Sequence, residues 1–168
     1  MEDMYNLLKD FFSHDMDLND LFDSEAIIWI DWREDDEDVV NYFNDMMDEP
    51  IDIQTASNGK PYGDDIVLQK GDKELLIPYG DEKDRDVTIK YFNDFVQPDY
   101  EVRWFVESLG NDTLGFTVLS GAEWANLEDE FGADTVHYYF EPINLESNMF
   151  NLDMDEVSTL LELRENKR

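Results

Sequence analysis

The stretch from Ala26 to Glu49, AIIWIDWREDDEDVVNYFNDMMDE, joins an apolar run to an acidic, amphipathic segment. Its opening run, 26–32, consists mainly of β-branched and aromatic residues, which is typical of a buried strand. Apolar residues then recur at helical spacing, as Val39, Val40, Tyr42, Phe43, Met46 and Met47. We therefore expect a strand followed by a helix that buries one side and exposes a densely negative side.

Similar patterns extend in both directions from this stretch. Apolar spacing predicts helices over 2–12, about 36–48, 86–96, 120–131 and 153–164, with a helical turn within 13–25. The helices after Ser120 and Asp153 begin with capping boxes, because Glu123 and Glu156 follow three residues later. Strands are expected over 26–32, 51–55, 66–69, 74–79, 100–107 and 113–119, while 134–140 suits either a strand or a helix.

Hairpin signals alternate with single helices along this chain, which favours an α+β fold. The Lys70-Gly71-Asp72-Lys73 turn is the clearest of these signals. We predict one acidic domain over 1–168, with a mainly antiparallel sheet of hairpins and helices packed against one of its faces. Residues 1–25 form an N-terminal helical segment in this prediction, and 153–164 form a C-terminal helix.

Negative charge dominates the composition, since 43 acidic residues face 12 basic ones among 168 residues and the net charge is −31. The bases are unevenly placed: Arg33 is the single Lys or Arg within 10–59, and 106–163 contains none. An aromatic content of 14% argues against a disordered acidic tail. Such a charge repels nucleic acid and anionic membranes, so a binding partner is expected to be basic.

The sequence offers little for catalysis. It contains no cysteine, and its two histidines, His14 and His137, fit a solvated turn and a packed or surface position. It lacks a nucleophile elbow, a phosphate-binding loop and a dinucleotide fingerprint. Without a signal peptide or a long apolar segment, the expectation is a cytoplasmic protein of a bacterial host cell that is not an enzyme and needs no cofactor.

Calcium is the metal to test, because carboxylates are its ligands. Asp15, Asp17 and Asn19 match the first ligand positions of an EF-hand loop, but Asp20 and Ala26 occupy the places of the essential Gly and Glu. The run from Asn151 has Glu156 where the Gly belongs, and helix capping accounts for it better. We expect no dedicated metal site.

The acidic clusters have three interpretations. They form an ordinary solvated face with carboxylates near helix N-termini, or an adaptation to high salt, which the aromatic-rich and alanine-poor composition disfavours, or a surface that imitates nucleic acid. Carboxylates three or four residues apart on a helix lie about 5–6 Å apart, near the phosphate repeat of one strand. The residues expected to bind the partner are Asp35, Asp36, Glu37, Asp38, Asp45, Asp48 and Glu49, extended by Asp15, Asp17, Asp20 and Asp23.

In length, acidity and lack of a catalytic motif the chain resembles the DNA-mimic inhibitors of phages and mobile elements: anti-restriction proteins, anti-CRISPR proteins and uracil-glycosylase inhibitors. That resemblance implies an inhibitor that blocks the DNA- or RNA-binding site of a CRISPR effector or restriction enzyme. Residues 86–143, which include DYEVRWFVESLGNDTLGFTVLSGAEWANLEDEFG, are similar to bacterial toxin-immunity proteins. They imply the alternative of an immunity protein against a nuclease toxin. A third alternative is an acidic scaffold with no nucleic-acid competitor.

Overall fold

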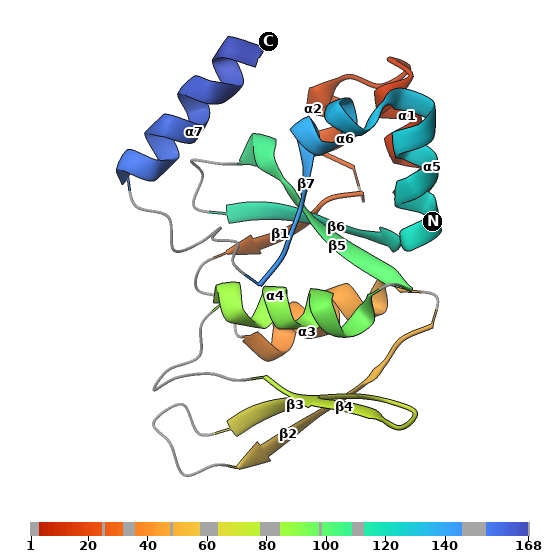
Figure 1. The fold of residues 1–168 in the computed structure, drawn as a ribbon, viewed down its shortest axis with the longest axis vertical. Helices are drawn as coiled ribbons and strands as arrows, with labels where there is room; N and C mark the ends of the chain where they lie inside the picture. Colours follow the sequence, from red (N-terminus) through yellow and green to blue (C-terminus); the bar gives the residue numbers. More distant parts are fainter. Residues whose placement is uncertain are drawn as a thin grey trace.

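The computed structural model describes residues 4–24, 26–31, 36–47, 49–57, 64–77, 85–97, 99–108, 113–145 and 154–167. Within these residues the chain forms α-helices and two antiparallel sheets, which confirms the predicted α+β class (Figure 1). The helices are α1 (Met4–Phe12), α2 (Leu18–Phe22), α3 (Asp36–Asp45), α4 (Arg85–Val96), α5 (Gly121–Phe131), α6 (Ala133–Tyr139) and α7 (Met154–Lys167). The strands are β1 (Ile28–Asp31), β2 (Asp52–Ser57), β3 (Asp64–Lys70), β4 (Lys73–Leu76), β5 (Tyr100–Phe105), β6 (Thr113–Ser120) and β7 (Phe140–Pro142).

The strands divide between two sheets instead of joining one. The four-stranded sheet has the order β1-β6-β5-β7, and the three-stranded sheet has the order β2-β3-β4. Each neighbouring pair is antiparallel, with Ile28 of β1 opposite Phe116 of β6 and Trp104 of β5 opposite the same Phe116. The segment 134–140, whose sequence suits either a strand or a helix, forms helix α6 up to Tyr139 and continues into strand β7 at Phe140.

Helices cover both faces of the four-stranded sheet, so the prediction of a single covered face is wrong. Helices α3 and α4 lie between the two sheets, and α1, α2, α5 and α6 lie on the far side of the four-stranded sheet (Figure 1). Phe43 of α3 contacts Phe116 on one face, with ring centroids 6.0 Å apart, while Phe22 contacts Phe105 on the other at 5.2 Å. The reason is that β5 and β6 carry buried side chains on both faces, and each face needs a cover.

Hydrogen bonds from the side chains of Asn44, Asn93 and Lys73 to the backbone hold α3 and α4 in place. The side-chain amide of Asn44 donates to the Ile51 carbonyl at 2.9 Å and accepts from the Ile51 N–H at 2.7 Å, which fixes the exit from α3. Asn93 of α4 likewise accepts from the N–H of Val102 and donates to the carbonyl of Ile143. The Lys73 ammonium donates to the carbonyl of Phe95 at 2.6 Å, so the β3–β4 hairpin is tied to the end of α4.

The capping box predicted at Ser120 is confirmed. The Ser120 hydroxyl accepts from the Glu123 N–H at 3.1 Å, and the Glu123 carboxylate accepts from the Ser120 N–H at 3.0 Å. The matching prediction at Asp153 lies outside the described residues. Among the described residues, no helix is both long and apolar enough to cross a membrane.

Candidate functional site

Helix α3 buries one side, as its spacing predicts, but Tyr42 and Met46, which the spacing placed on that side, are exposed. Val39, Val40 and Phe43 are fully buried, and Met47 in the following turn is also buried. The remaining side presents, at intervals of three or four residues, Asp38, Tyr42, Asp45 and Met46, all of which are exposed. These four residues are called the α3 face below. Asp38, Tyr42 and Asp45 lie on α3, and Met46 lies in the turn that directly follows the helix, so the α3 face runs along α3 into that turn.

The carboxylates of the α3 face have no counter-charge within the described part of the chain. Asp38 and Asp45 form no ion pair with any described residue, and the same holds for Glu49, which follows the helix. Glu49 is positioned through its backbone, because its N–H donates to the Tyr100 hydroxyl at 3.0 Å. The described ion pairs lie elsewhere, so the field of these acids is directed into solvent.

The structure removes Asp36 from the residues predicted to bind the partner. Its side chain is buried, with 6% of the residue exposed, and it accepts a hydrogen bond from the Thr88 hydroxyl of α4 at 2.8 Å. It therefore joins two helices and is not available to a partner. Glu37 is half-buried, while Asp35 and Asp48 lie outside the described residues.

The second acidic group does not extend the α3 face. Asp15, Asp17, Asp20 and Asp23 are exposed around α2, where the Asp17 carboxylate caps the helix by accepting from the Asp20 N–H at 2.8 Å. Phe22 anchors α2 on Phe105, which lies on the face of the sheet opposite to the one that α3 covers. The structure thus separates the two acidic groups that the sequence suggested as one.

Exposed acids also occur on other elements of the molecule. The described ones outside α2 and α3 include Asp10, Asp52, Asp72, Glu74, Asp94, Asp129, Glu130, Asp134, Asp155 and Glu162. What distinguishes the α3 face is its apolar content, because Tyr42 and Met46 are 38% and 37% exposed. Only two other large apolar residues of the described chain are exposed, Leu76 and Leu145.

A buried cationic cluster that sequence reasoning missed lies on the α5 side of the four-stranded sheet. The Arg103 side chain is 6% exposed; its Nε donates to Glu101 at 2.6 Å, and one terminal nitrogen donates to Glu128 at 2.8 Å. Its guanidinium stacks on the Trp124 ring at 4.5 Å, and its other terminal nitrogen has no hydrogen-bond partner. The sequence signal is a lone Arg in the otherwise apolar run VRWFV, which is also the single Lys or Arg within 91–163.

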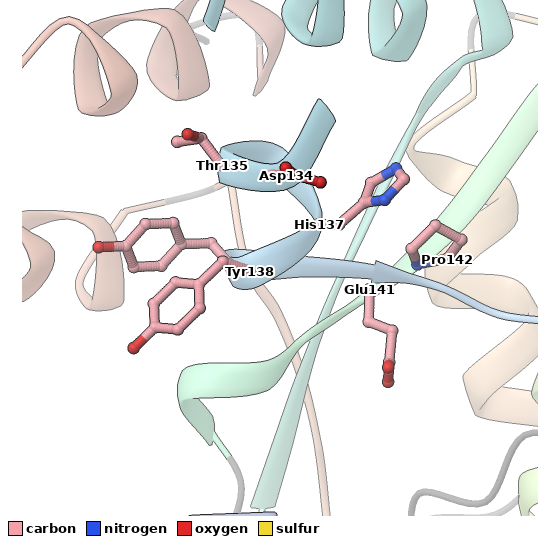
Figure 2. Close-up of a pocket in the computed structure, with 7 residues that line it drawn as sticks. Asp134, Thr135, His137, Tyr138, Glu141 and Pro142 are labelled. Carbon is pink, nitrogen blue, oxygen red and sulfur yellow. The ribbon is translucent and has the colours of Figure 1, made fainter. Parts of the chain in front are cut away.

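His137 belongs to the same cluster and lines a cavity of about 790 Å³ around α6 and β7. Its Nε2 lies 2.8 Å from the Glu128 oxygen that Arg103 also contacts, and its side chain is 43% exposed. Figure 2 shows the labelled lining side chains on different sides of the ribbon, with His137 and Pro142 on one side and Tyr138 on the other. They do not converge on a common point, as an acid–base pair and its substrate require.

Glu128 has a shifted pKa. Burial raises the pKa of its carboxyl, but the hydrogen bonds from His137 and Arg103, with the charge of Arg103 added, outweigh burial and place the pKa below its ordinary value of 4.5. A carboxyl with a depressed pKa in the folded state stabilises that state fully above its unfolded pKa, and this contribution is lost as the pH falls through the folded-state pKa.

No described group of three or more acidic or histidine side chains is arranged to hold a metal ion.

Replacing Glu128 with Gln is therefore expected to lower the free energy of unfolding at pH 7, with the difference from the parent protein shrinking as the pH falls below about 4.5. Urea unfolding at a series of pH values measures it. Glu130→Gln is the matched control, because Glu130 is exposed on the same helix and makes none of these bonds. A Glu128→Gln difference that stays constant from pH 7 to pH 3 would contradict this assignment.

No family model matches this chain, and neither the curated proteins nor the solved structures include a match to it.

Proposed function

We propose that the protein is an acidic inhibitor that binds the nucleic-acid site of a basic partner, such as a bacterial defence nuclease, through the α3 face. The observation that carries this proposal is the set of exposed carboxylates, Asp38, Asp45 and the adjacent Glu49, that have no ion pair among the described residues. Their charges are not neutralised within the described molecule and are free to interact with lysines and arginines of a partner.

The rigid support of α3 adds to this argument. Phe43 is fully buried against Phe92 of α4 and Phe116 of β6, and Asp36 is hydrogen-bonded to Thr88. The Asn44–Ile51 hydrogen bonds fix the other end of the helix. A partner therefore meets a preformed surface and does not have to order it on binding, which limits the entropic cost of association.

The electrostatics of such a complex have a clear consequence for its salt dependence. A site that normally binds nucleic acid releases counterions from phosphates, and an acidic protein replaces those phosphates with carboxylates. Association is then fast and weakens as ionic strength rises. The charge of −31 also prevents the protein from binding nucleic acid itself, so it competes for the partner's site without occupying the DNA.

The negative charge of the α3 face and of the adjacent Glu49 is the property to test. Asp38→Lys, Asp45→Lys and Glu49→Lys, combined in one variant, are expected to weaken partner binding by about 100-fold or more, because three attractive contacts become repulsive. The partner is obtained by cross-linking in a bacterial lysate, and its DNA binding is then measured with and without the protein. Asp36 stays unchanged, since a lysine there would enter a buried, hydrogen-bonded position.

The matched control reverses three exposed acids on distant helices, Asp129, Glu130 and Glu162, and so makes the same change in net charge. It is expected to retain most of the binding. If both variants lose binding equally, overall charge and not the α3 face governs association. If the captured partner binds DNA equally well with and without this protein, the proposed inhibition is wrong.

A further inference from the structure

Building on the proposed function, we infer that the α3 face docks a basic amphipathic segment of its partner, whose apolar side chains cover Tyr42 and Met46 while its lysines or arginines pair with Asp38 and Asp45. The first observation is the composition of the face. Two of the four exposed large apolar residues of the described chain belong to it: Tyr42 on α3 and Met46, four residues later, in the turn that directly follows the helix.

Isolated exposed apolar side chains are ordinary on protein surfaces, whereas neighbouring ones within a polar rim are typical of binding sites. Leu76 of β4 and Leu145, after β7, are ordinary in this sense, since they lie on separate elements. Asp38 instead lies one helix turn before Tyr42, and Asp45 directly precedes Met46 in the chain. Tyrosine is a frequent anchor of interfaces, and methionine adapts its flexible side chain to the partner's shape.

The charge of the face selects the partner's chemistry. A second copy of this chain is disfavoured as the occupant, because each copy carries a charge of −31 and the α3 face would meet its own carboxylates. A purely ionic phosphate-binding groove of the partner would supply cations for Asp38 and Asp45, but it would also place charged groups against Tyr42 and Met46. A segment with both lysines and apolar side chains satisfies both kinds of residue on the face.

The geometry suits an extended strip and not a pocket. The face runs from Asp38 to the end of α3 at Asp45, about 10 Å along the helix, and on to Met46 in the next turn. A partner helix laid along this strip presents its own side chains at the same intervals of three or four residues, as amphipathic helices do in grooves. The cavity around α6 and β7 and the one beside Asn93 and Ile143 are both lined by residues outside α3.

The test uses two labelled synthetic peptides of equal length and equal positive charge: an amphipathic Leu/Lys helix and a Ser/Lys peptide that lacks apolar side chains. Fluorescence anisotropy measures their affinity for the full chain at low and moderate salt. We expect the Leu/Lys helix to bind more tightly. Tyr42→Ser combined with Met46→Ser should weaken the Leu/Lys helix by about tenfold and leave the Ser/Lys peptide unchanged.

Leu76→Ser combined with Leu145→Ser is the matched control, since it removes the other two exposed apolar residues, and it should change neither affinity. Circular dichroism checks that each variant is folded. If the Tyr42/Met46 variant binds the Leu/Lys helix as the parent protein does, the inferred docking is wrong. Asp38→Asn combined with Asp45→Asn separates this outcome from failure of the proposed function: it should weaken both peptides, and if it weakens neither, the ionic role of the face fails as well.

Discussion

Replacing Arg103 with Met is expected to lower the free energy of unfolding by about 3 kcal/mol, because it removes a buried guanidinium that pairs with two partly buried carboxylates. Arg103 contacts Glu101 at 2.6 Å and Glu128 at 2.8 Å, and its guanidinium lies 4.5 Å from the Trp124 ring. The substitution removes both ion pairs and the stacking on Trp124 together, while methionine retains much of the apolar stem. Urea unfolding at pH 7 measures the loss.

Two further variants test whether burial of the Arg103 guanidinium causes the expected loss of stability. Lys70→Met breaks the exposed Lys70–Asp99 pair, whose side chains are 40% and 65% exposed, and should cost no more than about 1 kcal/mol. Adding Glu101→Gln and Glu128→Gln to Arg103→Met should recover part of the lost stability, because the variant then buries no unpaired charge. An Arg103→Met protein as stable as the parent would show that the cluster contributes nothing to folding.

Phe43→Ala is the second substitution with a large expected effect, a loss of about 3–5 kcal/mol in the free energy of unfolding. Phe43 is fully buried where α3 meets α4 and the four-stranded sheet, with ring centroids 5.5 Å from Phe92 and 6.0 Å from Phe116. Its removal opens a cavity between three elements that cannot close without moving a helix. The same urea experiment measures this change.

The adjacent residue is the control for Phe43→Ala. Tyr42 precedes Phe43 in the same helix turn and is 38% exposed, so Tyr42→Ala should lower the free energy of unfolding by about 1 kcal/mol or less. The pair also separates folding from binding, since we expect Phe43→Ala to reduce the folded population and Tyr42→Ala to reduce affinity. Equal losses of stability at both positions would contradict the described orientation of α3.

The features that the sequence predicted well depend on residues close together in the chain. Ser120 and Glu123 form their capping box within one helical turn, and the apolar spacing of 36–45 correctly placed Val39, Val40 and Phe43 on the buried side of α3, although not Tyr42. The β3–β4 hairpin follows in the same way from Lys70 to Lys73, where Gly71 adopts a positive φ.

The features that it missed depend on contacts between distant residues. The acidic run gives no indication that Asp36 turns inward, because that depends on Thr88, which lies on another helix. In the sequence Arg103 is only a lone base within an apolar run, and its role depends on Glu128 and Trp124 of α5. Similarly, local strand signals do not reveal that the strands form two sheets, or that α2 and α3 cover opposite faces of one of them.

The pairing of β1 with β6 alone has a consequence for synthesis of the chain on the ribosome. Residues 28–31 pair with residues 113–116, so β1 has no strand partner until most of the chain has been made. At about 5–20 residues per second, the ribosome needs several seconds or more to supply that partner. Meanwhile the apolar segment 26–30 stays unpaired, and its long-range contact makes closure of the four-stranded sheet a late event. The dense negative charge opposes association of such chains during this interval, through repulsion between copies.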